Sequence, residues 1–265
     1  MATCPGADES KVIVAGAWCH SIVPECARVV IISVRPRKNT RTINWLFGGM
    51  GGGRIVHYRI WIYSGFAGAH QECRVHPIGA FLWMARKHGV GSPEYDRYMV
   101  IRALYKRARG LAARIADMLG VPSNAAETVS CQDPLQKAWG QFGPEYDSTM
   151  KGMPALLHDL KGQAPAKYLE GIIPRSMTFV RRPGTPGHSN GSERIVRWFV
   201  ARSRHVFCAL PNWRAARNFG MVQTFAATCR RNGTPPYHAV LARGRDPEWD
   251  MSTSCASPPI LPHTA

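Results

Sequence analysis

The chain has 265 residues, of which 45% are hydrophobic, and it carries 8 Trp and 9 Phe. This apolar content excludes an intrinsically disordered chain, and the length is enough for one large domain or two small ones. The 34 Lys and Arg outnumber the 17 Asp and Glu, which gives a formal net charge of +17. Most of these cations are Arg, whose planar fork suits bidentate phosphate contacts, so the charge predicts a polyanionic partner. Nucleic acid is the first candidate and an anionic membrane surface is the second.

Membrane insertion and secretion find no support in the sequence. No apolar run reaches the length of a membrane span, and the first residues lack a basic region followed by an apolar one. The eight Cys are scattered along a chain too long for a small disulfide scaffold, which favours reduced thiols. These features predict a soluble, cytoplasmic protein.

Short apolar runs predict the first elements of the chain. Residues 1–7 make a poor strand because they include a proline and a glycine, whereas two β-branched runs favour strands over Arg28 to Val34 and Arg54 to Tyr63. A short helix is expected over Thr40 to Phe47. The glycine-rich segment from Gly48 to Gly53 lacks the lysine of a phosphate-binding loop, so it predicts a flexible turn.

The clearest helix spans Pro93 to Gly120. One face is apolar and is expected to pack inward, with Met99, Leu104, Ala108, Leu111, Ile115 and Met118. The remaining surface is basic, with Arg97, Arg102, Lys106, Arg107, Arg109 and Arg114. A DNA-facing surface and a merely solvated basic face explain this charge equally well.

A second helix follows a Pro/Gly-rich loop, in the stretch TPGHSNGSERIVR from Thr185 to Arg197. Ser189 or Asn190 can cap its first turn, where Glu193 is favoured by the positive end of the helix dipole. Ile195, Trp198 and Phe199 recur at helical spacing and are expected to face inward, while positive charge comes from Arg194, Arg197, Arg202 and Arg204. Taken alone, this segment is an ordinary capped amphipathic helix. A short helix is expected after Gly233, and a Pro/Ser-rich tail follows from Pro247.

Several motifs in this chain are similar to those of one enzyme family. The group Ser189, Asn190, Glu193, Arg194 and Arg197, followed by TCRRNG at 228–233, resembles the Asn-Asn-x-x-Glu-Arg motif and the Thr-x-Arg-x-x-Gly helix end of the insertion-sequence-sixty-six family of bacterial DDE transposases. DESKVIVAG at 8–16 resembles that family's Asp-Glu-Thr-Gly-x-x-Val-x-Gly signature. The family's His-x-x-Cys-x-x-His motif is matched by His70, Cys73 and His76, and its preceding strand end by His57, Trp61 and Tyr63.

The resemblance implies an α/β fold, an RNase H-like mixed sheet flanked by helices, with a helical insertion before the last catalytic helix. By the same likeness, Asp8 and Glu193 are catalytic residues that hold Mg²⁺ or Mn²⁺, and Arg194, Arg197, Arg202 and Arg204 bind DNA. Such enzymes cleave transposon ends and join them to target DNA. However, the family's second aspartate falls at Tyr58, which is neutral at pH 7 and a poor ligand for a hard cation. We therefore expect cleavage and strand transfer to be impaired.

The likeness also suggests how the chain is organised. Residues 1–92 would form the first part of the catalytic domain, 93–180 the helical insertion, 181–246 the last part of the domain, and 247–265 a disordered tail. The expected partners are transposon-end and target DNA in the bacterial cytoplasm, at the nucleoid, and not a membrane. Assembly into a homo-oligomer is left open.

Three alternatives stay open at this stage. His70, Cys73 and His76 could be zinc ligands that lack a fourth partner, or Cys73 and His76 could close a strand and enter a helix with Pro77 in its first turn. The whole chain could be a non-enzymatic nucleic-acid-binding protein derived from a transposase, in which the positive charge alone acts. It could also be a decayed reading frame that barely folds.

Overall fold

The computed structural model describes residues 5–26, 28–47, 53–58, 61–120, 132–159, 172, 175–182, 184–207 and 209–249. The chain divides into two compact units. The first unit comprises Met1–Ala7 and Lys38–Asn190, and the second comprises Asp8–Arg37 and Gly191–Ala265. The glycine-rich turn predicted over 48–53 lies outside the described residues except for Gly53, and so does the tail from residue 250.

A β-hairpin opens the chain. Strand β1 (Gly6–Val14) and strand β2 (Ala17–Glu25) are joined by only two residues, Ala15 with φ 50° and Gly16 with φ 75°. Two successive residues of positive φ form the type I′ turn whose twist matches that of the paired strands. The strand starts at Gly6, which differs from the expectation that residues 1–7 would be poorly suited to a strand.

The predicted strand over Arg28 to Val34 is wrong in extent, because strand β3 covers only Ser33–Arg35. Within the second unit, the N–H groups of Val30 and Ile32 donate instead to the hydroxyls of Thr228 (3.2 Å) and Thr224 (2.8 Å). Both threonines lie on helix α8 (Trp213–Arg231). The helix therefore satisfies backbone donors that a neighbouring strand would otherwise have bonded.

The fold is α/β with a mixed five-stranded sheet in the order β3-β2-β1-β4-β5. Strand β4 (Arg54–His57) is parallel to β1 and to β5 (Ala69–Glu72), whereas β3 is antiparallel to β2. The strand predicted over Arg54 to Tyr63 is correspondingly shorter than expected, since a 3-10 turn, η2 (Trp61–Gly65), follows β4.

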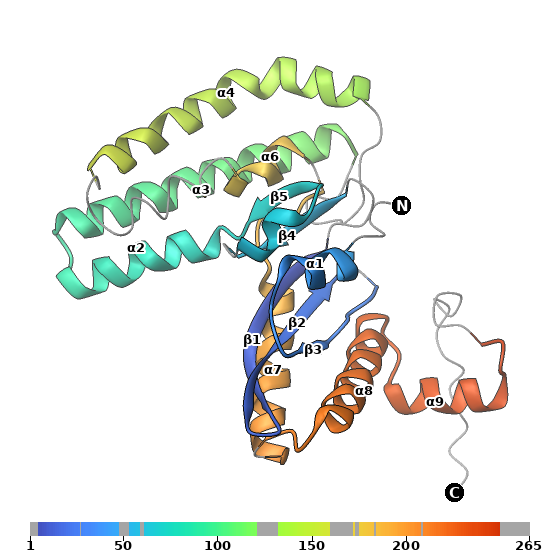
Figure 1. Cartoon of the computed structure of the whole chain (residues 1–265). Helices are drawn as coiled ribbons and strands as arrows, with labels where there is room; N and C mark the ends of the chain where they lie inside the picture. The colour runs from blue at the N-terminus through green and yellow to red at the C-terminus, as the bar shows by residue number, and fades with distance from the viewer. Residues whose placement is uncertain are drawn as a thin grey trace, which may run out of the picture. The chain divides into compact units, whose positions relative to one another are not determined.

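Long helices dominate the first unit (Figure 1). Helix α1 (Thr40–Phe47) is confirmed as predicted, and α2 (Val75–His88) begins directly after β5 with Pro77 in its first turn. Helices α3 (Pro93–Met118) and α4 (Gln132–Asp159) pack with α2 and the short α6 (Thr178–Arg181) around an apolar cluster.

Helix α3 confirms the clearest helix prediction, with one correction to its buried face. The Ser92 hydroxyl accepts a hydrogen bond from the N–H of Tyr95 at 3.2 Å and caps the first turn. Met99 and Met118 are 41% and 39% exposed, so the predicted core face is wrong at both ends. The buried positions lie nearer the middle of the helix: Ile101, Leu104, Tyr105, Ala108, Leu111, Ile115 and Ala116.

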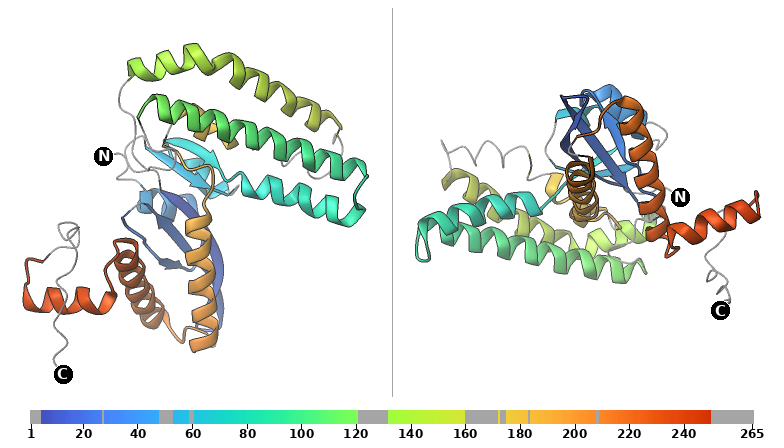
Figure 2. Two further views of the ribbon diagram at one scale, coloured as in Figure 1. Left: turned by 180° about the vertical axis from the view of Figure 1, so that it is seen from behind. Right: turned by 90° about the horizontal axis from the view of Figure 1, so that it is seen from below.

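In the second unit, helices α7 and α8 pack with the hairpin and α9 contacts α8. Helix α7 (Asn190–Phe207) runs along the β1–β2 hairpin, as Figures 1 and 2 both show. Its Val196, Phe199 and Val200 join an apolar cluster with Val12 and Val14 of β1. Helix α9 (Pro236–Arg245) confirms the short helix expected after Gly233. Over the described ranges, the structure contains no helix of the length and apolarity that crossing a bilayer would need.

Candidate functional site

Asp8 and Glu193, the two acids singled out by the sequence, lie on facing surfaces within the second unit. Side chains alternate along a strand, so Asp8 points to the same face of β1 as Val12 and Val14, which pack against α7. On α7, Glu193 is three and seven residues before Val196 and Val200, so all three share the helix face that meets β1. Both acids are half-buried.

The two acids also lie at the same end of this unit, because α7 is fixed at both ends of the hairpin. Past the end of α7, Leu210 donates to the carbonyl of Ile13 (3.0 Å) and accepts from the N–H of Ala15 (2.8 Å), next to the hairpin turn. The start of α7 lies at the open end instead, where the N–H of Ser192 bonds the carboxylate of Glu25, the last residue of β2. Asp8, near the start of β1, is at that open end too.

Glu25 is a residue of this site that the sequence did not single out. Its carboxylate forms an ion pair with Arg231, and it also interacts with Arg194. Burial raises the pKa of Glu25 above its ordinary value, and the two arginines and the N–H of Ser192 oppose that rise. A Cβ added to Gly191 would lie 1.6 Å from an oxygen of Glu25, so any larger residue there would require the Glu25 side chain to move.

Glu25 therefore caps α7 from a distant strand. The predicted cap by Ser189 is wrong, because the Ser189 hydroxyl is buried and makes no hydrogen bond within the described structure. Glu193 lies in the first turn, as predicted, and it forms an ion pair with Arg197 one turn later. That pairing occupies the carboxylate with a cation from its own helix.

The predicted DNA-binding arginines have different surroundings. The guanidinium of Arg202 lies 4.3 Å from the ring centre of Trp198, and that of Arg230 lies 5.3 Å from it. Arg194 lines a hollow of about 700 Å³ between α7 and α8, together with Trp198, Arg230 and Arg231. Arg197, Arg202 and Arg204 are exposed. The arrangement offers an aromatic ring flanked by cations, which suits contact with a polyanion.

Tyr58, at the position of the family's second aspartate, lies in the first unit. It follows β4 directly, and its ring stacks on that of His76 with centres 3.7 Å apart. Its side chain is half-buried. A phenol held against an imidazole in this way presents no carboxylate for a divalent cation.

The parallel pair β4 and β5 carries a buried chain of polar side chains. His57 at the end of β4 is opposite Glu72 at the end of β5. The Nε2 of His57 lies 2.9 Å from Nδ1 of His70, whose own Nε2 lies 3.0 Å from the carbonyl of Phe66. A carbonyl only accepts, so His70 carries its proton on Nε2 and His57 donates from its own Nε2. Its Nδ1 then presents a lone pair to Glu72, 3.8 Å away.

Burial favours the neutral form of both imidazoles. Burial, with a further contribution from His70, lowers the pKa of His57 to about 3. Burial also lowers the pKa of His70. The ring of His57 stacks on Tyr63 with centres 4.6 Å apart. The buried His57 and Tyr63 and the half-buried His70 therefore form one assembly near the ends of two strands.

His70, Cys73 and His76 have separate contacts. His70 bonds to His57, the sulfur of Cys73 accepts from the N–H of Ser189 at 3.5 Å, and His76 stacks on Tyr58. Among the residues that the structure describes, no three His, Cys, Asp or Glu side chains are grouped so that they could hold a metal ion. Cys73 and His76 do close the strand and enter α2, as one of the two sequence alternatives proposed.

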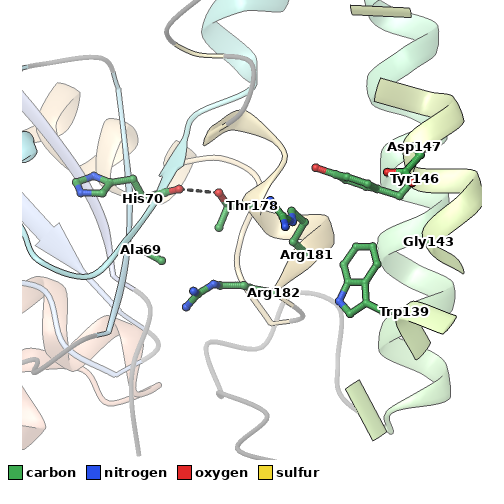
Figure 3. Close-up of a pocket in the computed structure, with 9 residues that line it drawn as sticks. All are labelled: Ala69, His70, Trp139, Gly143, Tyr146, Asp147, Thr178, Arg181 and Arg182. Atoms are coloured by element: carbon green, nitrogen blue, oxygen red, sulfur yellow. Dashed lines mark hydrogen bonds between the residues drawn. The ribbon is translucent and has the colours of Figure 1, made fainter. Parts of the chain in front are cut away.

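A pocket of about 570 Å³ lies beside this assembly in the first unit (Figure 3). Its lining comes from β5, α4 and the segment around α6. The hydroxyl of Thr178 donates to the carbonyl of His70 at 2.7 Å. The guanidinium of Arg181 lies 6.0 Å from the ring centre of Tyr146, and Asp147 also lines the pocket. The lining of this pocket therefore includes an acid, Asp147, as well as the arginines Arg181 and Arg182.

Comparison with family models, with curated proteins and with solved structures found no match for this chain.

Proposed function

We propose that this chain is a DNA-binding protein of transposase type, related to the insertion-sequence-sixty-six family, with an RNase H-like fold and impaired strand cleavage. The observation that carries the proposal is the placement of Asp8 and Glu193 on facing surfaces at the open end of the β1–β2 hairpin. These acids are 185 residues apart in the chain, and the family resemblance alone selected both of them.

The sheet supports the RNase H-like assignment. In such sheets the opening strand carries the first catalytic aspartate, and here Asp8 lies on β1 in the middle of a mixed sheet. The last catalytic acid of the family opens a helix, and here Glu193 is in the first turn of α7. A long helical segment, α3 and α4, separates the Tyr58 position from this helix, in keeping with the family's insertion.

The residues present do not fit a two-metal centre. Such a centre needs several carboxylates around two ions about 3.5–4 Å apart, and no group of three candidate ligands occurs among the described residues. Tyr58 supplies a neutral phenol, and Glu193 is paired with Arg197. The chain as it stands therefore supports no metal-dependent step. If the chain is active, Asp8 and Glu193 are the residues expected to hold Mg²⁺ or Mn²⁺.

DNA binding rests on charge. The net charge of +17 predicts strong, salt-dependent binding to a polyanion. Arg194, Arg197, Arg202 and Arg204 lie on the same helix as Glu193, so they would hold phosphates beside the former catalytic position. Location at the bacterial nucleoid is a further prediction of the same proposal, and assembly into a homo-oligomer is left open.

A plasmid-nicking assay with Mg²⁺ or Mn²⁺ tests the transposase proposal. We expect little or no nicking by the parent chain and a gain of about tenfold in Tyr58→Asp, because the family resemblance assigns the second catalytic carboxylate to this position. The gain should disappear in Tyr58→Asp combined with Glu193→Gln. Tyr58→Asn is the matched control, since it has nearly the same shape without the charge. No gain in Tyr58→Asp would contradict the assignment of Tyr58 to the family's second aspartate.

The second candidate is a non-enzymatic nucleic-acid-binding protein, and the Glu193–Arg197 ion pair favours it. An acid bound to its neighbouring arginine stabilises a helix without any catalytic role. This candidate predicts that Glu193→Gln binds DNA as tightly as the parent, and that Tyr58→Asp restores nothing. Isothermal titration with Mn²⁺ separates the two candidates, because a vestigial carboxylate pair would still take up the ion and a purely structural pair would not.

A further inference from the structure

A strongly basic pocket lies in the first unit, apart from any residue that the family resemblance selected. It has a volume of about 810 Å³ and lies between the start of α2, the middle of α3 and the loop at 185–188. Arg74, Arg102, Lys106 and Arg109 line it, and the lining residues that the structure describes include no Asp or Glu. We refer to it as the α3 pocket.

Arg74 is built into the wall of this pocket. Its guanidinium lies 5.2 Å from the ring centre of Phe179, and a Cβ on Gly187 would be 2.8 Å from its Nη1. The N–H of Arg74 donates to the carbonyl of Gly187 at 3.1 Å. The guanidinium therefore lies against both the glycine and the aromatic ring, and such contacts restrict a side chain whose fork suits bidentate binding of an anion.

The charge of Arg74 is not balanced by an acid. Burial and the nearby Arg109 both lower the pKa of Arg74, so its surroundings disfavour the positive charge. Within the described part of the chain, its guanidinium has no carboxylate partner. A half-buried cation beside a second cation costs free energy, which a bound anion would offset.

The other cations indicate how large that anion is. Arg102, Lys106 and Arg109 are spaced four and three residues apart on α3, so they extend over roughly 10 Å of one helix face. Their side chains are exposed, whereas Arg74 is half-buried. A single phosphate would be held by Arg74 and one neighbour, but the full row matches several consecutive phosphates.

We propose that the α3 pocket binds the phosphate backbone of a nucleic acid, with one phosphate held by Arg74 and Arg109 and the next ones by Lys106 and Arg102. This inference rests on the proposed DNA binding and assigns part of it to the first unit. Tyr98 also lines the pocket and offers a ring to a neighbouring sugar or base.

Fluorescence anisotropy with a labelled duplex and a labelled single strand, titrated at several salt concentrations, tests this assignment. Arg74→Gln and Arg109→Gln should each weaken binding about five- to twentyfold, and each should lower the slope of log K against log salt by about 1. Arg107→Gln is the matched control. It removes the same charge from the same helix but does not line the pocket, so it should change affinity by less than about twofold. The unfolding curve of each variant shows whether it is folded.

The outcomes separate this inference from the function on which it rests. If the parent chain binds neither DNA, the proposed function fails. If the parent binds but Arg74→Gln and Arg109→Gln bind as tightly as Arg107→Gln, the α3 pocket assignment fails while DNA binding stands. Titration with inorganic phosphate or a mononucleotide is the third arm: saturable millimolar binding that Arg74→Gln abolishes, without any loss of DNA affinity, would make this a small-anion site and overturn the proposal.

Discussion

The arginines near the start of α7 and those of the α3 pocket have different surroundings. Near the start of α7, Arg231 pairs with Glu25 and Arg197 pairs with Glu193, and Arg194 also interacts with Glu25. In the α3 pocket of the first unit, the described lining residues include no acid. Compensated arginines stabilise a fold, whereas uncompensated ones are available to a polyanion.

The contrast shows that basic residues which look alike in the sequence can have two roles in the fold, in ion pairs or at a surface open to an anion. Both α3 and α7 are amphipathic helices with basic exposed faces, and the sequence alone treats them alike. Only the fold brings a carboxylate from β2 to the start of α7. Four predictions, in decreasing order of their expected size, test this difference.

Gly191→Ala should cost the most, because the added methyl group would meet the carboxylate of Glu25 at 1.6 Å. Relieving the clash requires the Glu25 side chain to move, which weakens both its ion pair with Arg231 and its cap on α7, so we expect a loss of about 2–3 kcal/mol in the free energy of unfolding. Urea unfolding followed by near-ultraviolet circular dichroism measures it. Gly244→Ala in α9, where nothing lies within 4 Å of the new Cβ, is the control and should be neutral or slightly stabilising. Equal midpoints for the two variants would rule out the cap by Glu25.

Low pH should lower the free energy of unfolding of the first unit because of His57. The unfolded imidazole has a pKa near 6.5 and the folded one has a pKa of about 3, so only the unfolded chain binds this proton between those values. Stability is therefore complete above pH 6.5 and falls steadily as the pH drops toward 3, with a loss of about 2 kcal/mol by pH 5.

Urea unfolding at pH 7 and pH 5 measures this loss. His57→Phe keeps the stacked ring but cannot titrate, so its stability should change less between the two pH values. His205→Phe alters an exposed histidine and should leave the dependence as it is in the parent. A parent-like slope in His57→Phe would mean that another group causes the acid sensitivity.

Glu25→Gln and Arg74→Gln compare the two kinds of charge directly. Removing the carboxylate leaves Arg231 without its ion pair and weakens the cap on α7, which should cost about 1–2 kcal/mol. Removing the uncompensated cation in the α3 pocket should change stability by less than about 0.5 kcal/mol, since it relieves repulsion from Arg109. Urea unfolding of both variants measures these losses. A larger loss of stability in Arg74→Gln than in Glu25→Gln would show that the charge of Arg74 is structural.

Part of this picture could be predicted from the sequence. Periodicity was sufficient for α1, α3 and α9, and helix capping rules placed Glu193 in the first turn of α7. These features depend on residues a few positions apart. The acid in the first turn and the apolar spacing act locally, so the sequence carries them directly.

The parts that were missed depend on distant residues. The strand predicted over Arg28 to Val34 is mostly irregular because hydroxyls from α8, almost 200 residues later, satisfy its backbone. Glu25 escaped notice because an isolated acid near the end of a strand carries no local signal. The contacts among His57, His70 and Glu72 depend on the parallel register of β4 and β5. The positions of these three residues in the sequence do not reveal that register.

Arg197→Gln should have a small effect on stability. Its ion pair with Glu193 spans one helical turn, and the arginine side chain is 77% exposed, so water screens most of the attraction. We expect a loss of about 0.3–0.5 kcal/mol in the free energy of unfolding.

The same substitution removes one of the proposed phosphate contacts, so the salt slope of DNA binding should fall by about 1. Arg86→Gln, in the last turn of α2, serves as the control for both readouts because it lies outside α7 and the α3 pocket. A loss above 1 kcal/mol with an unchanged salt slope would mean that Arg197 serves the helix and not the polyanion.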